Sequence, residues 1–379
     1  MPSKKIPIWA IQKNCMRKIL KNNMRNSIIE SDLHYITNEN LPWEMFNGKT
    51  VLVSGASGFL PAYMVETFLY LNETRQSNIK VIGLVRNIKK ARERFIFYKG
   101  NKNLKLIIQD VCEEIKINEN IDYIIHAASL ATPKVFQENP VGVLSPNVIG
   151  TANLLKLAVE KKVKNFLFFS TSGVYGYVDQ SSYPLKEDCF GSLNPADIAS
   201  CYLESKRMGE NMCIAWMHQY GVPVKIVRPA ITYGPGVMLN DGRSFADFIS
   251  NIVNKQDVAL FSDGKAIRNF CYIADATLGF FIVILKGEVG QAYNVATDYE
   301  ISIIDLVKTL VEKVFPERKL KVVMKADDSK KYLRMDFPRT TVDITKLKAL
   351  GWKLNFPIEE GFKRTVKSIE ESNNIRKES

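Results

Sequence analysis

The sequence is poor in histidine, and its cysteines are scattered. Three histidines occur in 379 residues, and the six cysteines form no Cys-x-x-Cys pair and no regular spacing. Zinc sites take their ligands from closely spaced cysteines and histidines, so no metal centre is expected. Scattered cysteines in a chain of this size are typical of reduced, mostly buried thiols. The pattern therefore predicts a cytoplasmic protein without metal or structural disulfides.

Long apolar runs are also missing. Hydrophobic residues make up 46% of the chain, yet no run reaches the length of about 18 apolar residues that a transmembrane helix needs. The apolar residues near the N-terminus never form a continuous segment, so no secretory signal is expected. The sequence predicts no integral membrane contact.

Acidic side chains are outnumbered, 40 against 52 basic ones. Half of the net charge of +12 lies in residues 1–30, which contain seven Lys or Arg and one Glu. No aromatic RNA-binding motif accompanies this charge, so nucleic acid is not an expected partner. Residues 1–42 are predicted to be a basic extension. Three interpretations stay open: an amphipathic helix touching a membrane surface or partner, a peripheral helical extension, or an upstream start codon with the real start near Met24.

Residues 49–65 predict a strand, a glycine turn and a helix in immediate succession. An apolar run ends at Ser54, Gly55 and Gly58 form the turn, and a helical pattern opens near Pro61. In this context the glycines indicate a dinucleotide site, with a pyrophosphate at the helix N-terminus. A tight turn in another α/β fold is the alternative. Proline replaces the usual third glycine, which the first turn of a helix tolerates.

Strands and helices alternate after this motif, which predicts a Rossmann fold with a doubly wound parallel sheet. Further strands are expected at 80–85, 104–108, 122–126, 165–170 and 224–228, and helices at 62–71, 141–160 and 200–220. We expect a dinucleotide-binding domain at 43–230 and a smaller C-terminal substrate lobe, mainly 231–379, with helices at 245–253 and 303–314.

The second strand ends at Arg86, where a carboxylate would bind the ribose 2′-hydroxyl of NAD. An arginine there suits a 2′-phosphate or stacks on adenine, so NADP stays open, although NAD is favoured. Asp110 is placed to meet the adenine or to cap a helix. The residues predicted to bind the cofactor are Gly55, Ser57, Gly58, Phe59, Leu60, Arg86, Asp110, Val111, Ala127, Ala128, Tyr202 and Lys206.

A hydroxyl-rich strand end and a Tyr-x-x-x-Lys pair predict the catalytic residues. Tyr202 and Lys206 are four residues apart and share one face of the expected helix. A lysine ammonium and a cationic nicotinamide near a phenol favour phenolate and lower the tyrosine pKa from about 10. Such a tyrosine can take a proton from a sugar hydroxyl while hydride leaves for NAD. Thr171, or Ser170 beside it, is predicted to hydrogen-bond the same hydroxyl.

Further motifs carry a family resemblance: Ala128-Ser-Leu-Ala-Thr-Pro133, Glu138-Asn-Pro140, Asn240-Asp-Gly-Arg243, Arg268-Asn-Phe-Cys-Tyr272 and Leu350-Gly-Trp352. The chain resembles the extended short-chain dehydrogenases/reductases of the NAD-dependent epimerase/dehydratase family, most closely the UDP-glucuronate decarboxylases. The similarity spans about residues 43–370. It implies that a nucleotide sugar is oxidised at its C4 hydroxyl, altered as the 4-keto sugar and usually given the hydride back.

The resemblance also assigns roles. It implies that Tyr202 and Lys206 form the catalytic pair with Thr171, and that Arg243 and Arg268 hold the diphosphate. The alternative for both arginines is a surface ion pair. The residues expected to bind the substrate are Asn147, Ser172, Arg243 and Arg268. Helices 141–160 and 200–220 commonly form a dimer interface in this family, so a homodimer is expected.

The chain departs from the family at three positions. Gly173 replaces a glutamate of dehydratases and decarboxylases, Ala199 replaces a decarboxylase arginine, and Ile231 replaces an asparagine. Dehydration needs an acid and a base that Gly173 cannot supply. Epimerisation needs neither, because the 4-keto sugar only has to rotate and receive hydride on its other face. The favoured function is therefore 4-epimerisation, with UDP-glucuronate decarboxylase and sugar 4,6-dehydratase as alternatives. A non-catalytic NAD(P)- or RNA-binding Rossmann protein represents a different class.

Overall fold

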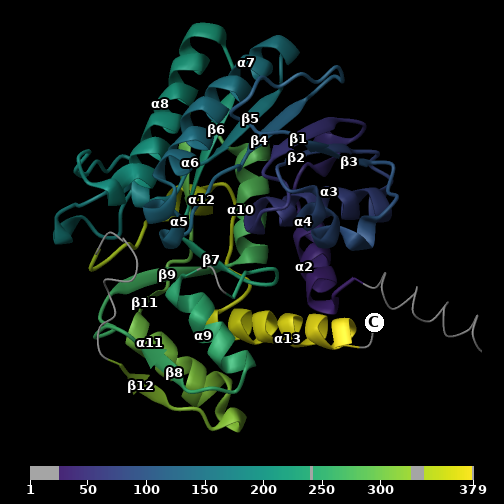
Figure 1. Cartoon of the computed structure of the whole chain (residues 1–379). Coiled ribbons are helices and arrows are strands. Elements are labelled where there is room, and N and C mark those ends of the chain that lie inside the picture. The colour runs from purple at the N-terminus through teal and green to yellow at the C-terminus, as the bar shows by residue number, and fades with distance from the viewer. Residues whose placement is uncertain (1–24, 240–241, 326–336, 378–379) are drawn as a thin grey trace, which may run out of the picture.

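A seven-stranded parallel sheet forms the centre of this computed structural model, which describes residues 25–239, 242–325 and 337–377 (Figure 1). The strand order is β10-β6-β5-β4-β1-β2-β3, and every neighbouring pair is parallel. The strands are β1 (Thr50–Ser54), β2 (Lys80–Val85), β3 (Leu104–Ile108), β4 (Tyr123–His126), β5 (Asn165–Phe169), β6 (Val224–Pro229) and β10 (Ala292–Val295). The chain order reverses between β1 and β4, where doubly wound sheets bind ligands. The predicted Rossmann fold is confirmed.

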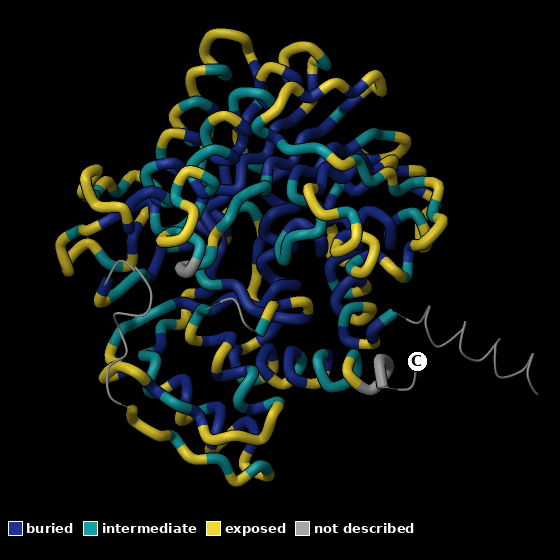
Figure 2. Tube along the Cα trace, viewed as in Figure 1, coloured by how far each residue is buried: buried dark blue, intermediate teal, exposed yellow. Residues whose placement is uncertain are grey.

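Helices cover both faces of the sheet, so its strands are apolar on both sides. Along β1, Val51 and Val53 join one core with α3 (Phe59–Arg75) and α10 (Ile273–Lys286), while Leu52 joins a second core with α7 (Thr151–Lys161) and α8 (Cys201–Tyr220). This alternation follows from the two-residue period of a strand. Figure 2 shows the sheet buried at the centre and exposed residues at the rim.

The long helix predicted at 141–160 is interrupted. It consists of α6 (Pro140–Ser145), a π-helical turn η3 (Pro146–Gly150) and α7. Pro146 lacks the N–H that an α-helix would use at this point, so the regular hydrogen-bond ladder cannot pass through it. The wider π turn accommodates this break. It brings Asn147 under the neighbouring helix α8.

A smaller lobe is built after β6 and lies beside the carboxyl ends of the main strands (Figure 1). Its sheets pair β7 (Ile231–Tyr233), β9 (Ile267–Tyr272) and β11 (Glu300–Ser302), and β8 (Val258–Leu260) with β12 (Val322–Met324). Its helices include α9 (Ser244–Val253), α11 (Ile303–Lys308) and the π-helical η7 (Thr309–Val314). The segment after residue 230 also returns to the main domain, because α10 packs on the large sheet and β10 pairs with β6.

Residues 25–42 are integrated into the fold. Helix α2 (Ser27–Asn38) buries Asp32 completely, and its carboxylate accepts hydrogen bonds from Tyr63 (3.0 Å) and Tyr272 (2.8 Å). Arg364, on the C-terminal helix α13 (Ile358–Lys377), donates to the same carboxylate at 2.5 Å. Asp32 therefore joins α3, β9 and α13.

Two parts of the predicted features lie outside the described residues: positions 1–24 of the extension, and Asn240 with Asp241 of the Asn-Asp-Gly-Arg motif. Within the described part of the chain, no helix is long and apolar enough to cross a membrane.

Candidate active site

The β1–α3 turn lies directly against the end of β4. Gly55 has a φ of +66°, and a Cβ atom there would lie 2.8 Å from the Cα of Ala128. Only glycine allows both this conformation and this approach. The structure thus brings together Gly55, Ala127 and Ala128, three of the residues predicted to bind the cofactor.

The N-terminus of α3 opens beside this turn. Gly58 is the N-cap and supplies no side chain to the first N–H groups. The first helical hydrogen bond runs from the N–H of Ala62 to the carbonyl of Gly58 (3.1 Å), so Pro61 occupies the first turn without losing a bond. Unpartnered N–H groups and the helix dipole make this end suitable for an anion such as a pyrophosphate. Ser57, Phe59 and Leu60 are half-buried around it.

Gly83, which was not among the predicted site residues, packs closely against the turn. A Cβ atom on Gly83, in the middle of β2, would lie 2.9 Å from the Cβ of Ala56. Close packing under the turn therefore depends on Gly83 rather than on a third glycine in α3. The signal was a glycine within an apolar strand, which indicates close approach of another backbone.

The residues predicted to meet the adenosine lie at the ends of β2 and β3. Arg86 and Asp110 face one another with 4.0 Å between the guanidinium and carboxylate, and 53% of the Arg86 side chain is exposed. An ion pair this exposed to solvent contributes little free energy, so it holds Arg86 weakly. Val111 is different, because its side chain is buried against Gly150 and its carbonyl accepts from Asn153. The structure does not bring the Val111 side chain to the site.

A hydrogen-bond chain fixes the end of β4. The hydroxyl of Ser54 lies 2.8 Å from Nδ1 of His126 and accepts from the N–H groups of Ala127 and Ala128, both at 3.1 Å. Nε2 of His126 lies 3.0 Å from the hydroxyl of Thr151. Burial, together with the nearby Lys206 charge, lowers the pKa of His126 to about 3, so the imidazole is neutral. His126 therefore connects Ser54 to the helix that carries Thr151 through hydrogen bonds.

The three predicted catalytic residues gather where β5 and α8 meet. Tyr202 and Lys206 lie one turn apart on α8, and Thr171 follows β5 as the N-cap of the short helix η4 (Ser172–Tyr175). Thr171 hydrogen-bonds the Tyr202 hydroxyl. Lys206 is buried, and its ammonium donates to the carbonyl of Phe169 at 2.6 Å. Ser172 is half-buried next to Thr171.

In the protein alone, burial dominates the electrostatics of Tyr202. Burial raises its pKa to about 12, and it outweighs the two groups that oppose this rise, Thr171 through its hydrogen bond and Arg243 through its charge. The ammonium of Lys206 faces Phe169 and lies 6.0 Å from the centre of the tyrosine ring. The expected lowering of this pKa depends on a cationic nicotinamide as well as on Lys206, so it stays a prediction.

An aromatic residue that sequence reasoning missed lies on the catalytic tyrosine. Phe136, from α5 (Pro133–Glu138), stacks on the ring of Tyr202 with centroids 5.2 Å apart and an interplanar angle of 14°. The contact joins segments far apart in the chain, so no local pattern signals it. It covers one face of the phenol with an apolar surface, which adds to the burial that raises the tyrosine pKa.

The predicted substrate residues are distributed unevenly. Asn147 is fully buried, and its amide donates to the hydroxyl of Ser205 (2.9 Å) behind Lys206, so it does not reach the site surface. Arg268 donates to the carbonyls of Ile267 and Phe337, both at 2.8 Å. Arg243 precedes α9, and its guanidinium lies 4.8 Å from the centre of the Phe245 ring. Its charge acts on the phenol of Tyr202, the predicted catalytic tyrosine.

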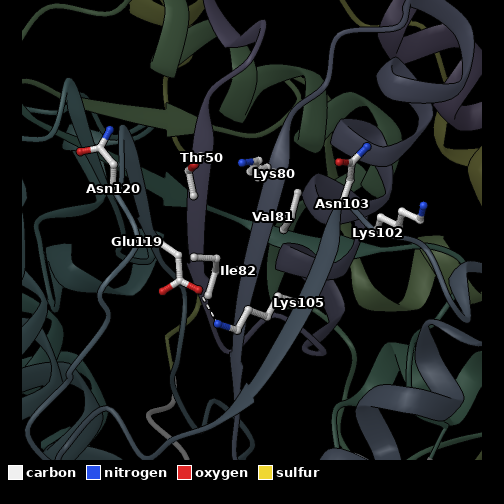
Figure 3. Close-up of a pocket in the computed structure, with 9 residues that line it drawn as sticks. All are labelled: Thr50, Lys80, Val81, Ile82, Lys102, Asn103, Lys105, Glu119 and Asn120. Atoms are coloured by element: carbon white, nitrogen blue, oxygen red, sulfur yellow. Dashed lines mark hydrogen bonds and ion pairs between the residues drawn. The ribbon is translucent and has the colours of Figure 1, made fainter.

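A hollow of about 510 Å³ lies at the other end of the strands (Figure 3). Its walls include Lys80, Lys102 and Lys105, and Lys105 is paired with Glu119. This hollow is at the amino ends of β1–β3, away from Tyr202 and from the turn at Gly55. The predicted catalytic and cofactor residues lie instead at the carboxyl ends of the strands. Within the described residues, no cluster of three His, Cys, Asp or Glu side chains could hold a metal.

Comparison with known proteins identifies the family. Residues 51–296 match the model of the NAD dependent epimerase/dehydratase family. The chain belongs to this family. UDP-glucuronic acid decarboxylase 1 of Xenopus tropicalis is 32% identical over 321 residues, covering 84% of this chain and 71% of that protein. UDP-glucuronic acid decarboxylase 5 of Arabidopsis thaliana is also 32% identical, over 82% of this chain and 86% of that protein.

Solved structures of epimerases share the fold of this epimerase/dehydratase family member. UDP-glucose 4-epimerase of Thermotoga maritima, with UDP-glucose, has a TM-score of 0.72 at 24% identity and covers 86% of this chain and 99% of that one. UDP-glucuronic acid 4-epimerase of Bacillus cereus, with UDP-glucuronic acid and NAD, has a TM-score of 0.71 at 20% identity and covers 85% and 99%.

The family is NAD-dependent, and the residues present fit this cofactor. The glycine turn leaves no space for a Cβ atom at Gly55, and the N-terminus of α3 is open to a pyrophosphate. Near the strand ends, the buried hydroxyls of Ser129 and Ser170 have no hydrogen-bond partner among the residues that the structure describes. Buried hydroxyls of this kind are normally satisfied, so they indicate a place for a polar ligand.

Replacing Tyr202 by phenylalanine is expected to abolish turnover of the nucleotide sugar. The change removes the ionisable hydroxyl and keeps the ring that stacks on Phe136, so the rate should fall roughly 10²–10⁴-fold while the fold is kept. Steady-state turnover and circular dichroism check this. Tyr220→Phe, at the exposed end of the same helix, is the control. Near-normal turnover by the Tyr202 variant would contradict the assignment.

Proposed function

We propose that this chain is a UDP-glucuronate decarboxylase that acts through a 4-keto intermediate. The two relatives compared above, each 32% identical, are UDP-glucuronic acid decarboxylases. The structural observation that supports the proposal is that the charge of Arg243 acts on the phenol of Tyr202. Tyr202 would meet the C4 hydroxyl, and in a uronate the C6 carboxylate lies on the adjacent carbon C5. A guanidinium pairs with such a carboxylate through two charge-assisted hydrogen bonds.

The residues divide the reaction between them. Tyr202, as the phenolate that a bound cationic nicotinamide would favour, takes the proton of the C4 hydroxyl, and Thr171 holds the same hydroxyl in line. NAD, when bound, accepts the C4 hydride and later returns it. The 4-keto uronate is a β-keto acid, so the C5–C6 bond breaks, CO₂ leaves and its electron pair passes toward the C4 carbonyl. C5 then takes a proton from water, C4 regains hydride and Tyr202 returns its proton to the C4 oxygen, with no net oxidation.

The departure at Gly173 is compatible with this chemistry. A Cβ atom there would lie 2.5 Å from Cδ2 of the buried Leu203, so an apolar side chain fills the space beside position 173. Loss of CO₂ from a β-keto acid needs no carboxylate at this point, whereas 4,6-dehydration needs an acid and a base. Arg243 also supplies a cation near the tyrosine although position 199 is alanine.

The favoured expectation of 4-epimerisation has weaker support. The epimerases among the structural neighbours are 24% identical or less, so they carry the fold and not the reaction. Gly173 and Ala199 are the observations that favour epimerisation, because it needs neither of the replaced side chains. It remains the second candidate.

Incubation with UDP-glucuronate and NAD is expected to release CO₂ and to give a nucleotide sugar lighter by that mass. Mass spectrometry and proton NMR follow the product, with UDP-glucose as the matched substrate that has no carboxylate to lose. An unchanged mass with inverted configuration at C4 would establish epimerisation. A 4-keto-6-deoxy product lighter by one water, formed from a nucleotide hexose, would establish dehydration.

Replacing Arg243 by methionine is expected to raise KM for UDP-glucuronate about 10–100-fold, the range for losing a charged hydrogen bond. Affinity for UDP alone, measured by calorimetry, should stay within twofold, because UDP has no uronate. Arg243→Lys keeps the charge and should lose less. Equal weakening of UDP and UDP-glucuronate would instead assign Arg243 to the diphosphate, as the family resemblance implies.

We also propose a homodimer formed through α7 and α8. Three apolar side chains on these helices are exposed, namely Val159 (37%), Met208 (50%) and Ile214 (36%). Light scattering should give twice the chain mass of 43.0 kDa. The double variant Met208→Glu/Ile214→Glu should give the single mass, because charges on an apolar interface are costly to bury. A wild-type protein that scatters as a single chain would refute the dimer.

A further inference from the structure

Lys206 occupies an unusually apolar place for a charged group. Its side chain is 2% exposed, and the ammonium donates to the carbonyl of Phe169. The same ammonium lies 5.0 Å from the centre of the Phe168 ring and 6.0 Å from that of Tyr202. An ammonium removed from water needs a compensating negative charge to stay protonated.

Glu210 lies one helical turn after Lys206, on the same face of α8. Both of its carboxylate oxygens are held by Arg228, at the end of β6: Nε to Oε1 is 2.9 Å and Nη2 to Oε2 is 2.7 Å. The two side chains are 14% and 9% exposed. This bidentate geometry fixes the carboxylate in position.

Arg228 is itself anchored at two further points. It donates to the hydroxyl of Tyr175 (3.1 Å) and to the carbonyl of Glu187 (2.8 Å). Tyr175, in η4, donates onward to the amide oxygen of Asn294 in β10 (2.6 Å). The carboxylate of Glu210 is thus tied to the segment that carries Thr171 and to the edge strand of the sheet.

We propose that Glu210, clamped by Arg228, is a positioning residue whose carboxylate, one helical turn from Lys206, keeps the Lys206 ammonium charged for catalysis. A buried ion pair adds little net stability compared with a well-packed apolar pair. A carboxylate at this position therefore has a purpose beyond holding the fold. The effect of Glu210 on turnover rests on the proposed function, whereas its effect on the charge of Lys206 does not.

The charges around Lys206 support this role. Burial lowers the pKa of Lys206 to about 7, and the groups that oppose this fall are Glu210 and Cys213. Burial raises the pKa of Cys213 and keeps it a neutral thiol, while Tyr202 and His126 are neutral at pH 7. Glu210 is therefore the negatively charged member of this set, and the cation of Arg228, which clamps it, lies at the end of β6. Without it, the pKa of Lys206 falls further and the ammonium is lost at neutral pH.

The test compares Glu210→Gln with wild type by NMR of ¹⁵N-lysine, with Lys206→Met to assign the signal. The pKa of Lys206 should fall by at least one unit. In the pH profile of turnover, the alkaline limb should move to lower pH by the same amount, because the active form needs the ammonium. At pH values above this limb, the rate should fall tenfold. Glu210→Asp should recover most of the shift. Glu204→Gln, on the same helix beside the more exposed Arg207, should show none.

A second variant covers the loss of the clamp. Glu210→Gln leaves Arg228 buried without its carboxylate, which destabilises proteins. Glu210→Gln/Arg228→Met removes both charges and should show the same fall in the Lys206 pKa. An unchanged Lys206 titration in both variants, or a rate loss equal at every pH, would overturn the proposal. A shifted titration in a protein that turns over no UDP-glucuronate would support the proposal and refute the proposed function instead.

Discussion

The site depends on how closely two backbones approach at the carboxyl edge of the sheet. The turn after β1 touches the end of β4 at Gly55 and Ala128, and no side chain fits between them. Ser54 secures the same junction by binding His126 and the N–H groups after it. Because β1 and β4 are the neighbours at which the strand order reverses, this contact fixes both the cofactor cradle and the start of α3.

The chemistry is placed by a second junction, between β5 and α8. Lys206 reaches back to the last residue of β5, and Thr171 follows that strand to meet Tyr202. Arg243 comes from the lobe, so the charge beside the phenol depends on how the lobe sits on the sheet. Catalytic groups from three separate parts of the chain therefore converge on one hydroxyl.

The sequence allowed prediction of the parts governed by local patterns. Strands β1–β6 and the pairing of Tyr202 with Lys206 on one helix face follow from periodicity and spacing. The four-residue strand β10 was missed, because so short a run has little periodicity of its own and its strand character comes from pairing with β6. The stack of Phe136 on Tyr202 and the filling of Gly173 by Leu203 are non-local contacts. Phe136 adds to the burial of the phenol, so no local pattern could have predicted how strongly burial raises the tyrosine pKa.

The buried carboxylate of Asp32 bears on how the molecule is completed during synthesis. Its partners are residues 63, 272 and 364, and the last of these lies close to the end of the chain. A growing chain presents its N-terminal segments first, so α2 waits for α13 before its carboxylate is fully paired. All seven strands of the main sheet precede α13 in the chain, so the sheet can assemble before Arg364 completes the pairing of α2 with the lobe.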